Sequence, residues 1–168
     1  RLAEVIDAYD VETVIALGDS FHDADAALRI DPADRETLKI MQDACDWIWI
    51  TGNHDATIST AFGGTVVPEL TVEGLSLRHE PGPGAATHEI AGHLHPAARL
   101  VMNGTAIRRP CFVGNGLRLV LPAFGAFTGG LNVLDEAFLP LFGHDGFAVW
   151  LLGNEGLYPV ATRQLCGD

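Results

Sequence analysis

Four short polar motifs carry the side chains of this sequence that are best suited to chemistry. In chain order they are Gly18-Asp19, Gly52-Asn53-His54-Asp55, the single histidine His79, and Gly92-His93-Leu94-His95. Imidazole nitrogens, a carboxylate and an amide oxygen form a mixed donor set that suits manganese, iron or zinc better than calcium. The four motifs together therefore predict a metal site of this kind.

Each motif taken alone also has a purely structural interpretation. Asp19 can cap a helix or close a turn after its strand, and the 52–55 motif can form a turn. His79 can be a hydrogen-bonded core histidine, and the 92–96 segment can be a partly solvated strand. The occurrence of all four at strand ends, in this order, favours the chemical interpretation. The histidines without comparable context are left out of the metal shell: His22, His88 and His144.

The first third of the chain has the pattern of alternating helices and parallel strands. Apolar residues recur at helical spacing over 2–9 and again over 38–45. The continuous apolar runs 14–17 and 47–50 are typical of strands buried in a parallel sheet. A polar motif follows each run, and ligands of open α/β sheets bind outside the carboxyl ends of the strands. We therefore expect both motifs at one edge of the sheet.

From residue 65 onward the pattern becomes antiparallel. Hairpins are predicted over 70–77, over 111–120 with Asn115-Gly116 at its turn, and over 149–160. The sequence thus predicts an α/β half joined to a β-rich half.

The later histidines are predicted to lie on strand faces. His79 continues the alternation of Leu75 and Leu77 along one face of a strand. His93 and His95 are two residues apart, so in a strand they also share a face. This alternation would bring imidazoles toward a common site.

The composition limits the class of protein. The chain has 168 residues, of which 48% are hydrophobic, and no linker divides it, so we expect residues 1–168 to form a single domain. The net charge of −12 argues against broad electrostatic attachment to nucleic acid, so phosphate chemistry would need added cations. The sequence shows neither a membrane-length apolar run nor a signal-peptide layout. Its three cysteines form no CxxC pair, which fits a reducing, cytoplasmic location.

The order of the motifs resembles the signature of the calcineurin-like metallophosphoesterases, in which D-x-H is followed by GD, GNH[DE], H and GHxH. The resemblance spans most of the chain. Four longer stretches are similar to the ligase-associated DNA damage response endonucleases, the PdeM group of bacterial phosphoesterases: GDSFHD (18–23), RHEPGPG (78–84), EIAGHLHPAARL (89–100) and LPAFGAFTGGLNV (121–133).

This resemblance implies a fold and a cellular role. The fold is a metallophosphoesterase-type β-sandwich of two mixed sheets flanked by helices, in four α/β/β/α layers. The role is that of an endonuclease acting on DNA in bacterial repair, beside a DEXH-type helicase and an ATP-dependent DNA ligase.

The resemblance also implies the metal ligands. Two divalent cations are expected, with Mn²⁺ favoured over Fe or Zn. Asp19 would bridge both of them. Asn53, His79 and His93 would complete the second site, and His95 would belong to the first site.

The remaining site residues would serve the substrate. His54 would act on the leaving-group oxygen as general acid or charge stabiliser, and Asp55 would orient the His54 imidazole. Gly52 would let the backbone turn sharply at the strand end. Arg78, beside His79, can contact a phosphate, although an exposed salt bridge is an equal alternative.

The chain departs from the family pattern at the first motif. No D-x-H occurs upstream of Asp19, and the sequence begins inside what resembles the first helix of the family. The first metal site is therefore incomplete in this chain. We expect an N-terminally truncated fragment that lacks its first strand; the alternative is a lineage that has discarded catalysis.

Three functions remain open at this stage. The first is a metal-dependent phosphodiesterase or endonuclease that uses a hydroxide held by two metals for in-line attack. The second is another phosphoesterase, either a phosphatase or a cyclic-nucleotide esterase. The third is a non-catalytic scaffold of the same fold.

Overall fold

A computed structural model describes residues 1–168 except 24, 26–28, 57–59, 85–87, 126–127 and 144–145. The chain divides into two compact units, Arg1–Leu70 and Thr71–Asp168, which we call the first and second unit. Among the described residues, no helix is both long enough and apolar enough to cross a membrane.

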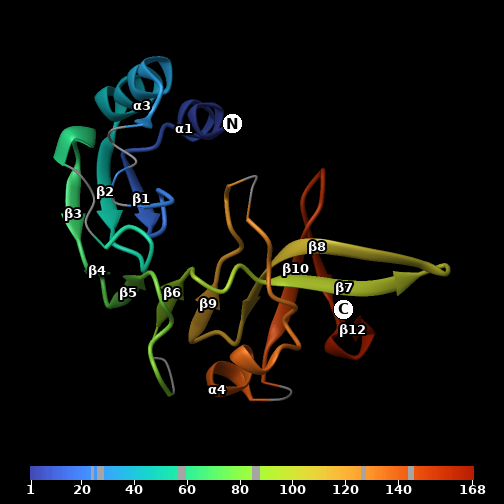
Figure 1. The fold of residues 1–168 in the computed structure, drawn as a ribbon. Helices are drawn as coiled ribbons and strands as arrows, with labels where there is room; N and C mark the ends of the chain where they lie inside the picture. Colours follow the sequence, from blue (N-terminus) through green and yellow to red (C-terminus); the bar gives the residue numbers. More distant parts are fainter. Residues whose placement is uncertain (24, 26–28, 57–59, 85–87, 126–127, 144–145) are drawn as a thin grey trace. The chain divides into compact units, whose positions relative to one another are not determined.

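The first unit contains a sheet of three strands with the order β1-β2-β3 (Figure 1). Both strand pairs are parallel, with Val14 opposite Trp47 and Ile48 opposite Thr65. The elements of this unit are α1 (Leu2–Tyr9), β1 (Thr13–Leu17), α3 (Pro32–Ala44), β2 (Asp46–Ile50), η1 (Thr60–Phe62) and β3 (Thr65–Val67).

The core of the first unit lies on one face of β2. Trp47 and Trp49 alternate onto this face, where they pack with Ile6 of α1 and Phe62. The α3 side packs through Leu38 and Met41, which fall three residues apart on the helix. One strand thus buries its two indoles against both helices.

The second unit is rich in strands and forms a mixed sheet with the order β11-β10-β8-β9-β6-β5-β4. β7 pairs with β8, and β12 pairs with β7. The strands are β4 (Glu69–Val72), which crosses the boundary between the units, β5 (Leu75–Arg78), β6 (Glu89–Ala91), β7 (Ala97–Met102), β8 (Thr105–Gly114), β9 (Arg118–Val120), β10 (Ala148–Leu152), β11 (Leu157–Val160) and β12 (Leu165–Cys166). Short helical turns are η2 (Glu136–Phe138), α4 (Leu139–Phe142) and η3 (Thr162–Gln164).

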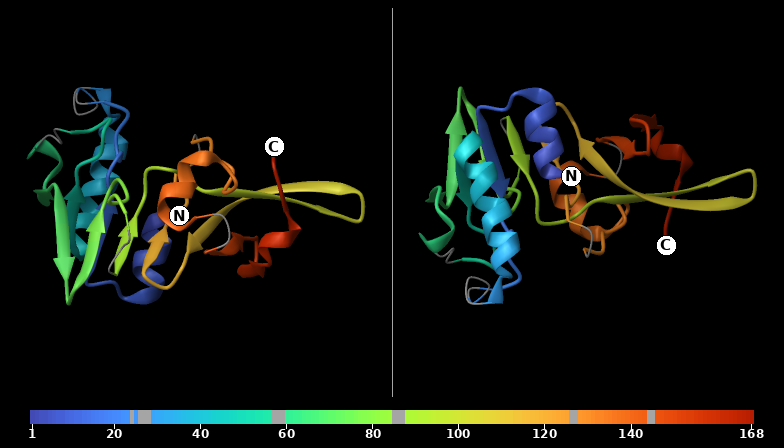
Figure 2. Two further views of the ribbon diagram at one scale, coloured as in Figure 1. Left: turned by 90° about the horizontal axis from the view of Figure 1, so that it is seen from below. Right: turned by 90° about the horizontal axis from the view of Figure 1, so that it is seen from above.

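The core of the second unit is centred on β8 and β10. Cys111 and Val113 of β8 are fully buried beside Val149 of β10, and Phe138 and Phe142 close the cluster from the helical turns. Figure 2 shows β7 and β8 continuing beyond this core as a long two-stranded hairpin. The hairpin tip is the Asn103-Gly104 turn, with both residues at positive φ.

The structure confirms most of the predicted elements. The helices and parallel strands of residues 2–50 are present, and the three predicted hairpins correspond to β4–β5, β8–β9 and β10–β11. The α/β class with two multi-stranded sheets is confirmed. The four-layer arrangement, the single domain and the missing first strand stay predictions.

The expectation of antiparallel pairing from residue 65 onward is wrong for two strands. β3 pairs in parallel with β2, and β6 pairs in parallel with both β5 and β9. Both are only three residues long, too short to show the continuous apolar run that marks buried parallel strands. The long β7–β8 hairpin is a further difference from the predicted elements, although Asn103-Gly104 at its tip is the residue pair typical of a two-residue hairpin turn.

Candidate functional site

In the first unit, two predicted motifs follow the carboxyl ends of neighbouring parallel strands. Leu17 of β1 lies opposite Ile50 of β2, so the Gly18-Asp19 and Gly52-Asn53 segments begin at the same sheet edge. Asp19 has a φ of 48°, in the left-handed region that non-glycine residues seldom adopt. Such backbone strain concentrates at functional sites. The register of β1 and β2 thus confirms that both motifs lie at one edge of the sheet, as predicted.

Asp55 joins these two segments. Its side chain is 1% exposed, and its carboxylate accepts four backbone N–H bonds. Oδ1 accepts from Asp19 at 3.0 Å and from Gly52 at 2.8 Å, while Oδ2 accepts from Ser20 at 2.7 Å and Phe21 at 3.3 Å. A buried carboxylate is stable only when its oxygens are satisfied in this way. Asp55 thus fixes residues 19–21 to the end of β2.

The contact that the sequence led us to expect for Asp55 is not present. Among the described residues, its hydrogen bonds run to backbone N–H groups, and none runs to His54. His54 is exposed, and its own backbone N–H donates to Asp19 Oδ1 at 2.9 Å. Asp55 therefore holds the loop that carries His54 rather than the imidazole itself.

Gly52 is required for space rather than for a turn. A Cβ placed on Gly52 would overlap the backbone nitrogen and the carboxylate of Asp19. Gly52 is not among the residues with positive φ, so the sharp turn that we expected is not the reason for glycine here. The glycine lets the β2 end approach Asp19 closely, and Asn53 follows it as an exposed residue.

In the second unit, the histidine motifs also follow neighbouring parallel strands. Arg78 of β5 lies opposite Ala91 of β6, so His79 and Gly92-His93 leave the sheet at one edge. The backbone N–H of Gly92 donates to the His79 carbonyl at 2.9 Å, which ties the two segments together. His79 is 6% exposed and His93 is half-buried.

The imidazoles of His79 and His93 point toward each other. His93 Nδ1 and His79 Nε2 are 3.1 Å apart, and the ring planes make an angle of 76°. Two nitrogens bound to one ion, each about 2.1 Å from it, are separated by roughly 3.0 Å at octahedral neighbours and by roughly 3.4 Å at tetrahedral neighbours. The two nitrogens are therefore at hydrogen-bond distance, and the same separation is compatible with both rings binding one transition-metal ion.

His93 and His95 do not lie on a strand, contrary to the sequence-based prediction. Residues 92–96 form an irregular segment between β6 and β7, and both histidines have positive φ, 67° and 45°. Alternation therefore does not apply to them. The left-handed backbone conformation orients the two rings instead of strand alternation. This conformation costs about 1–3 kcal/mol per residue. His79, likewise, is one residue beyond the end of β5.

Arg78 is half-buried and lies beside the loop that follows His79. A Cβ on Gly82 would come within 3.0 Å of Arg78 Nη1 and of Glu89 Oε2, so the guanidinium and that carboxylate flank the same glycine. Arg78 also lines a pocket of about 430 Å³ with Glu80, Pro81, Gly82, Pro83 and Leu141. Its predicted contact with a substrate phosphate stays a prediction.

A buried ion pair that we did not predict supports this loop. Arg118 and Glu89 are 2% and 7% exposed, and Arg118 Nε donates to Glu89 Oε1 at 2.7 Å. Arg118 also donates to the carbonyls of Gly82 and Gly84, and Glu89 accepts from the Gly82 N–H. Both residues sit at inward-facing strand positions, two residues before buried Val120 and Ala91. That alternation was the available signal, because a charged residue in an inward register is rarely unpaired.

The structure therefore brings the predicted residues together in two groups, each described within its own unit. Asp19, His54 and Asp55 are linked in the first unit, with Asn53 in the same loop. His79 and His93 contact each other in the second unit, and half-buried His95 lies in the His93 segment. Their assignment as metal ligands stays a prediction.

Comparison with solved structures identifies a similar protein. The chain is similar to the crystal structure of the Pseudomonas putida nuclease MPE, with 32% sequence identity and a TM-score of 0.71; the match covers 95% of this chain and 76% of that one. No protein-family model matches the chain, and no curated protein matches it either.

Proposed function

Because the chain belongs to the same family as the Pseudomonas putida nuclease MPE, we propose that it is a metal-dependent nuclease that hydrolyses phosphodiester bonds. The finer assignment to the calcineurin-like metallophosphoesterases, and to a role in DNA repair, is part of this proposal. The observation that carries it is the pair of facing imidazole nitrogens 3.1 Å apart at the carboxyl ends of β5 and β6.

The resemblance to the metallophosphoesterases assigns the metal ligands as Asp19, Asn53, His79, His93 and His95. This donor set of carboxylate, amide oxygen and imidazoles fits Mn²⁺, Fe or Zn. Two such cations would supply a metal-bound hydroxide for in-line attack and would offset the −12 charge of the chain toward an anionic substrate. The neutral Asn53 oxygen adds no negative charge opposite the phosphate.

His54 is assigned the proton transfer to the leaving oxygen. Its exposed position allows contact with a substrate, and its backbone bond to Asp19 Oδ1 keeps it next to a proposed ligand. The geometry gives Asp55 a different task, because its carboxylate holds the 19–21 and 52–55 segments in register. Positioning of this kind, one step removed from the metal, is typical of residues that support metal sites.

The experiment uses the full-length protein supplied with Mn²⁺. We expect hydrolysis of a single-stranded oligonucleotide and of bis-nitrophenyl phosphate, with a nitrophenyl monoester cleaved more slowly. His93→Gln and Asn53→Ala should each lower the bound metal, whereas His54→Ala should keep the metal and lose turnover. General acid catalysis is worth about 10²- to 10⁴-fold, so the loss should be larger for the oligonucleotide than for the nitrophenyl diester.

Three results would contradict the proposal or one of its assignments. Preferred cleavage of the monoester would identify a phosphatase instead. Full metal content without cleavage of any of the three substrates would identify a non-catalytic scaffold. Loss of metal in His54→Ala would make His54 a ligand and remove its assigned role.

A further inference from the structure

The charges of the chain are unevenly distributed along the sequence. Residues 1–70 contain 14 of the 22 acidic residues, whereas residues 91–134 contain none and carry four of the ten basic residues. Three of these four, Arg99, Arg108 and Arg109, lie on the β7–β8 hairpin. The hairpin is thus the part of an acidic protein where positive charge is not offset by neighbours in sequence.

The strand register places two of these arginines directly opposite each other. Arg99 pairs with Arg108 across β7 and β8, while Arg109 pairs with Ala98 and so projects from the other face. Like charges in directly opposed positions destabilise a strand pair. Acceptors offset this here: Arg99 donates to the Gly167 carbonyl at 2.7 Å, and Arg108 donates to the Gly130 carbonyl.

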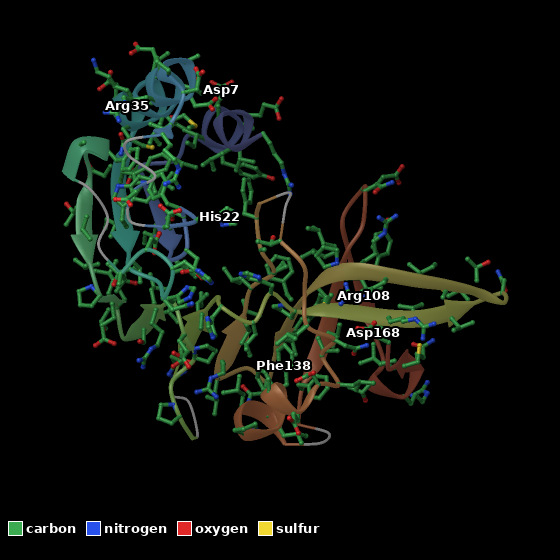
Figure 3. All side chains as sticks on the ribbon, viewed as in Figure 1. Asp7, His22, Arg35, Arg108, Phe138 and Asp168 are labelled. Carbon is green, nitrogen blue, oxygen red and sulfur yellow. The ribbon has the colours of Figure 1, made fainter. Side chains whose placement is uncertain are left out.

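Arg108 additionally holds a carboxylate in a two-pronged geometry. Its Nε is 3.0 Å from Asp168 Oδ1 and its Nη2 is 3.4 Å from Oδ2, and both side chains stay about half exposed (Figure 3). The Arg108 guanidinium lowers the pKa of the Asp168 carboxyl below its ordinary value. The same fork binds phosphate oxygens, because the two anions present similar oxygen pairs.

Arg109 has no such partner. It is exposed, and among the described residues no carboxylate, hydrogen-bond acceptor or aromatic ring contacts its guanidinium. Residues 105–110 of β8 pair with β7 alone among the described strands, so the other side of this segment is an open sheet edge. Figures 1 and 2 show the hairpin extending away from the rest of the second unit.

We propose that residues 105–110 of β8 form a contact surface for the phosphate backbone of a nucleic-acid strand that crosses this edge. Arg109 binds one phosphate on one face, and Arg108 binds another on the opposite face by exchanging the Asp168 carboxylate for it. This inference rests on the proposed nuclease function and adds where the substrate backbone is held. Charge complementarity is local, since the segment is basic within a chain of net charge −12.

The test measures binding of a fluorescently labelled single-stranded oligonucleotide to the full-length protein in EDTA, so that the strand is not cleaved. Each phosphate contact on a single strand contributes about −0.7 to the slope of log Kobs against log salt. Arg109→Gln should reduce the magnitude of the slope by about 0.7, and Arg108→Gln/Arg109→Gln should reduce it by about twice that amount. Lys39→Gln, which removes one exposed charge from α3, is the matched control and should leave the slope unchanged.

Asp168→Asn tests whether a phosphate replaces the Asp168 carboxylate on Arg108, and it should change the affinity in the opposite direction to the arginine variants. Removal of the competing carboxylate should raise affinity severalfold, whereas Asp43→Asn, the same charge change on α3, should not. Slopes for the two arginine variants equal to that of Lys39→Gln would overturn the proposal. So would oligomerisation of Arg109→Gln with unchanged binding, because the arginine would then only protect the edge from pairing with other chains. Hydrolysis of bis-nitrophenyl phosphate by the wild type tests the proposed function separately, so failure of one is distinguishable from failure of the other.

Discussion

The two units place their candidate metal ligands in the same way but hold the ligand-bearing segments together differently. Each places candidate metal ligands after the carboxyl ends of two neighbouring parallel strands, β1 and β2 in the first unit and β5 and β6 in the second. The first unit joins its two segments through a side chain, the Asp55 carboxylate, which accepts four backbone N–H groups. The second joins its segments through the backbone, from Gly92 N–H to the His79 carbonyl.

The cores behind these edges also differ. Among the described residues, ten buried residues form the cluster of the second unit and four form that of the first. The second unit adds the buried Arg118–Glu89 pair beneath the loop after His79. The second unit therefore has the larger buried core, while the two loop segments of the first unit are joined by the single Asp55 carboxylate.

The largest expected difference is in thiol reactivity. Burial raises the pKa of the Cys111 thiol from its ordinary 9.0 to about 12, whereas Cys45 of the first unit is half-buried. A shift of this size lowers the thiolate fraction near pH 8 by about a thousandfold, so a thiol reagent should modify Cys45 and the similarly half-buried Cys166 before Cys111, which should react only on unfolding. Mass spectrometry of the labelled peptides provides the measurement. Equal labelling rates would show that the core of the second unit is not the tighter one.

The same thiol gives a pH dependence of stability. The folded state holds Cys111 neutral, and its pKa is higher folded than unfolded. The resulting stability is therefore complete below about pH 9 and is lost as the pH rises from 9 toward 12. Cys111→Ser is unsuitable as a control because it adds a buried hydroxyl; Cys111→Ala removes the titration and should flatten this part of the profile.

The buried ion pair provides the largest expected stability change. Arg118→Met leaves the Glu89 carboxylate buried without its partner, which should cost about 3–5 kcal/mol of the free energy of unfolding. Arg118→Met/Glu89→Met should recover most of this loss, because it leaves no uncompensated charge. Urea denaturation of both variants and of Arg163→Met, an exposed position in the same unit, gives the comparison. If the single variant loses no more than Arg163→Met, the pair is not what stabilises the His79 loop.

Sequence reasoning found the ligand candidates but not the devices that hold them. Imidazole, amide and carboxylate side chains can be recognised in a sequence by residue type and spacing. Asp19, Asn53, His79, His93 and His95 could therefore be named as candidate metal ligands from the sequence. The left-handed backbone of His93 and His95 could not be predicted, because two histidines two residues apart are equally typical of one face of a strand.

Asp55 shows the second limit of the sequence. Its neighbour in sequence is His54, and proximity in sequence suggested an orienting contact. Its actual partners include Asp19, Ser20 and Phe21, which are 34 to 36 residues away. Only the pairing of β1 with β2 brings these groups together, so the role depends on tertiary structure that local pattern does not encode.

Asp55→Asn tests whether the first unit depends on this carboxylate. The asparagine keeps the shape, but its amide NH₂ cannot accept the N–H groups that one carboxylate oxygen now accepts. We expect metal affinity to fall by about 10- to 100-fold, as for other residues that orient metal ligands from behind. Mn²⁺ titration by calorimetry gives the affinity. Asp135→Asn in the second unit, which changes a carboxylate that accepts the Ala137 N–H, is the control and should leave affinity unchanged.

The role of Asp55 is distinguished from a merely stabilising one by a further measurement. The electron paramagnetic resonance spectrum of bound Mn²⁺ reports the ligand geometry and should change in Asp55→Asn at temperatures where the variant remains folded. An unchanged spectrum and affinity, with only a lower melting temperature, would mean that Asp55 supports the fold without setting the site.

The smallest expected effect concerns the helix of the first unit. Asp31 caps α3, where its Oδ1 accepts the Ala33 N–H at 2.8 Å, and Pro32 occupies the first helical position without needing a partner for an N–H. Asp31→Ala removes this acceptor and should cost about 0.5–2 kcal/mol, while Asp31→Ser should retain most of the cap. Because Leu38 and Met41 of α3 pack on the Trp47 and Trp49 face, the loss should appear as faster hydrogen exchange in α3 and β2.

Peptides from β8 and β10 should exchange at the wild-type rate if the second unit is the independent, more rigid one. Equal acceleration of hydrogen exchange in both units would show instead that the two units unfold together. The difference between a unit joined by a side chain and a unit joined by a backbone hydrogen bond would then not extend to stability.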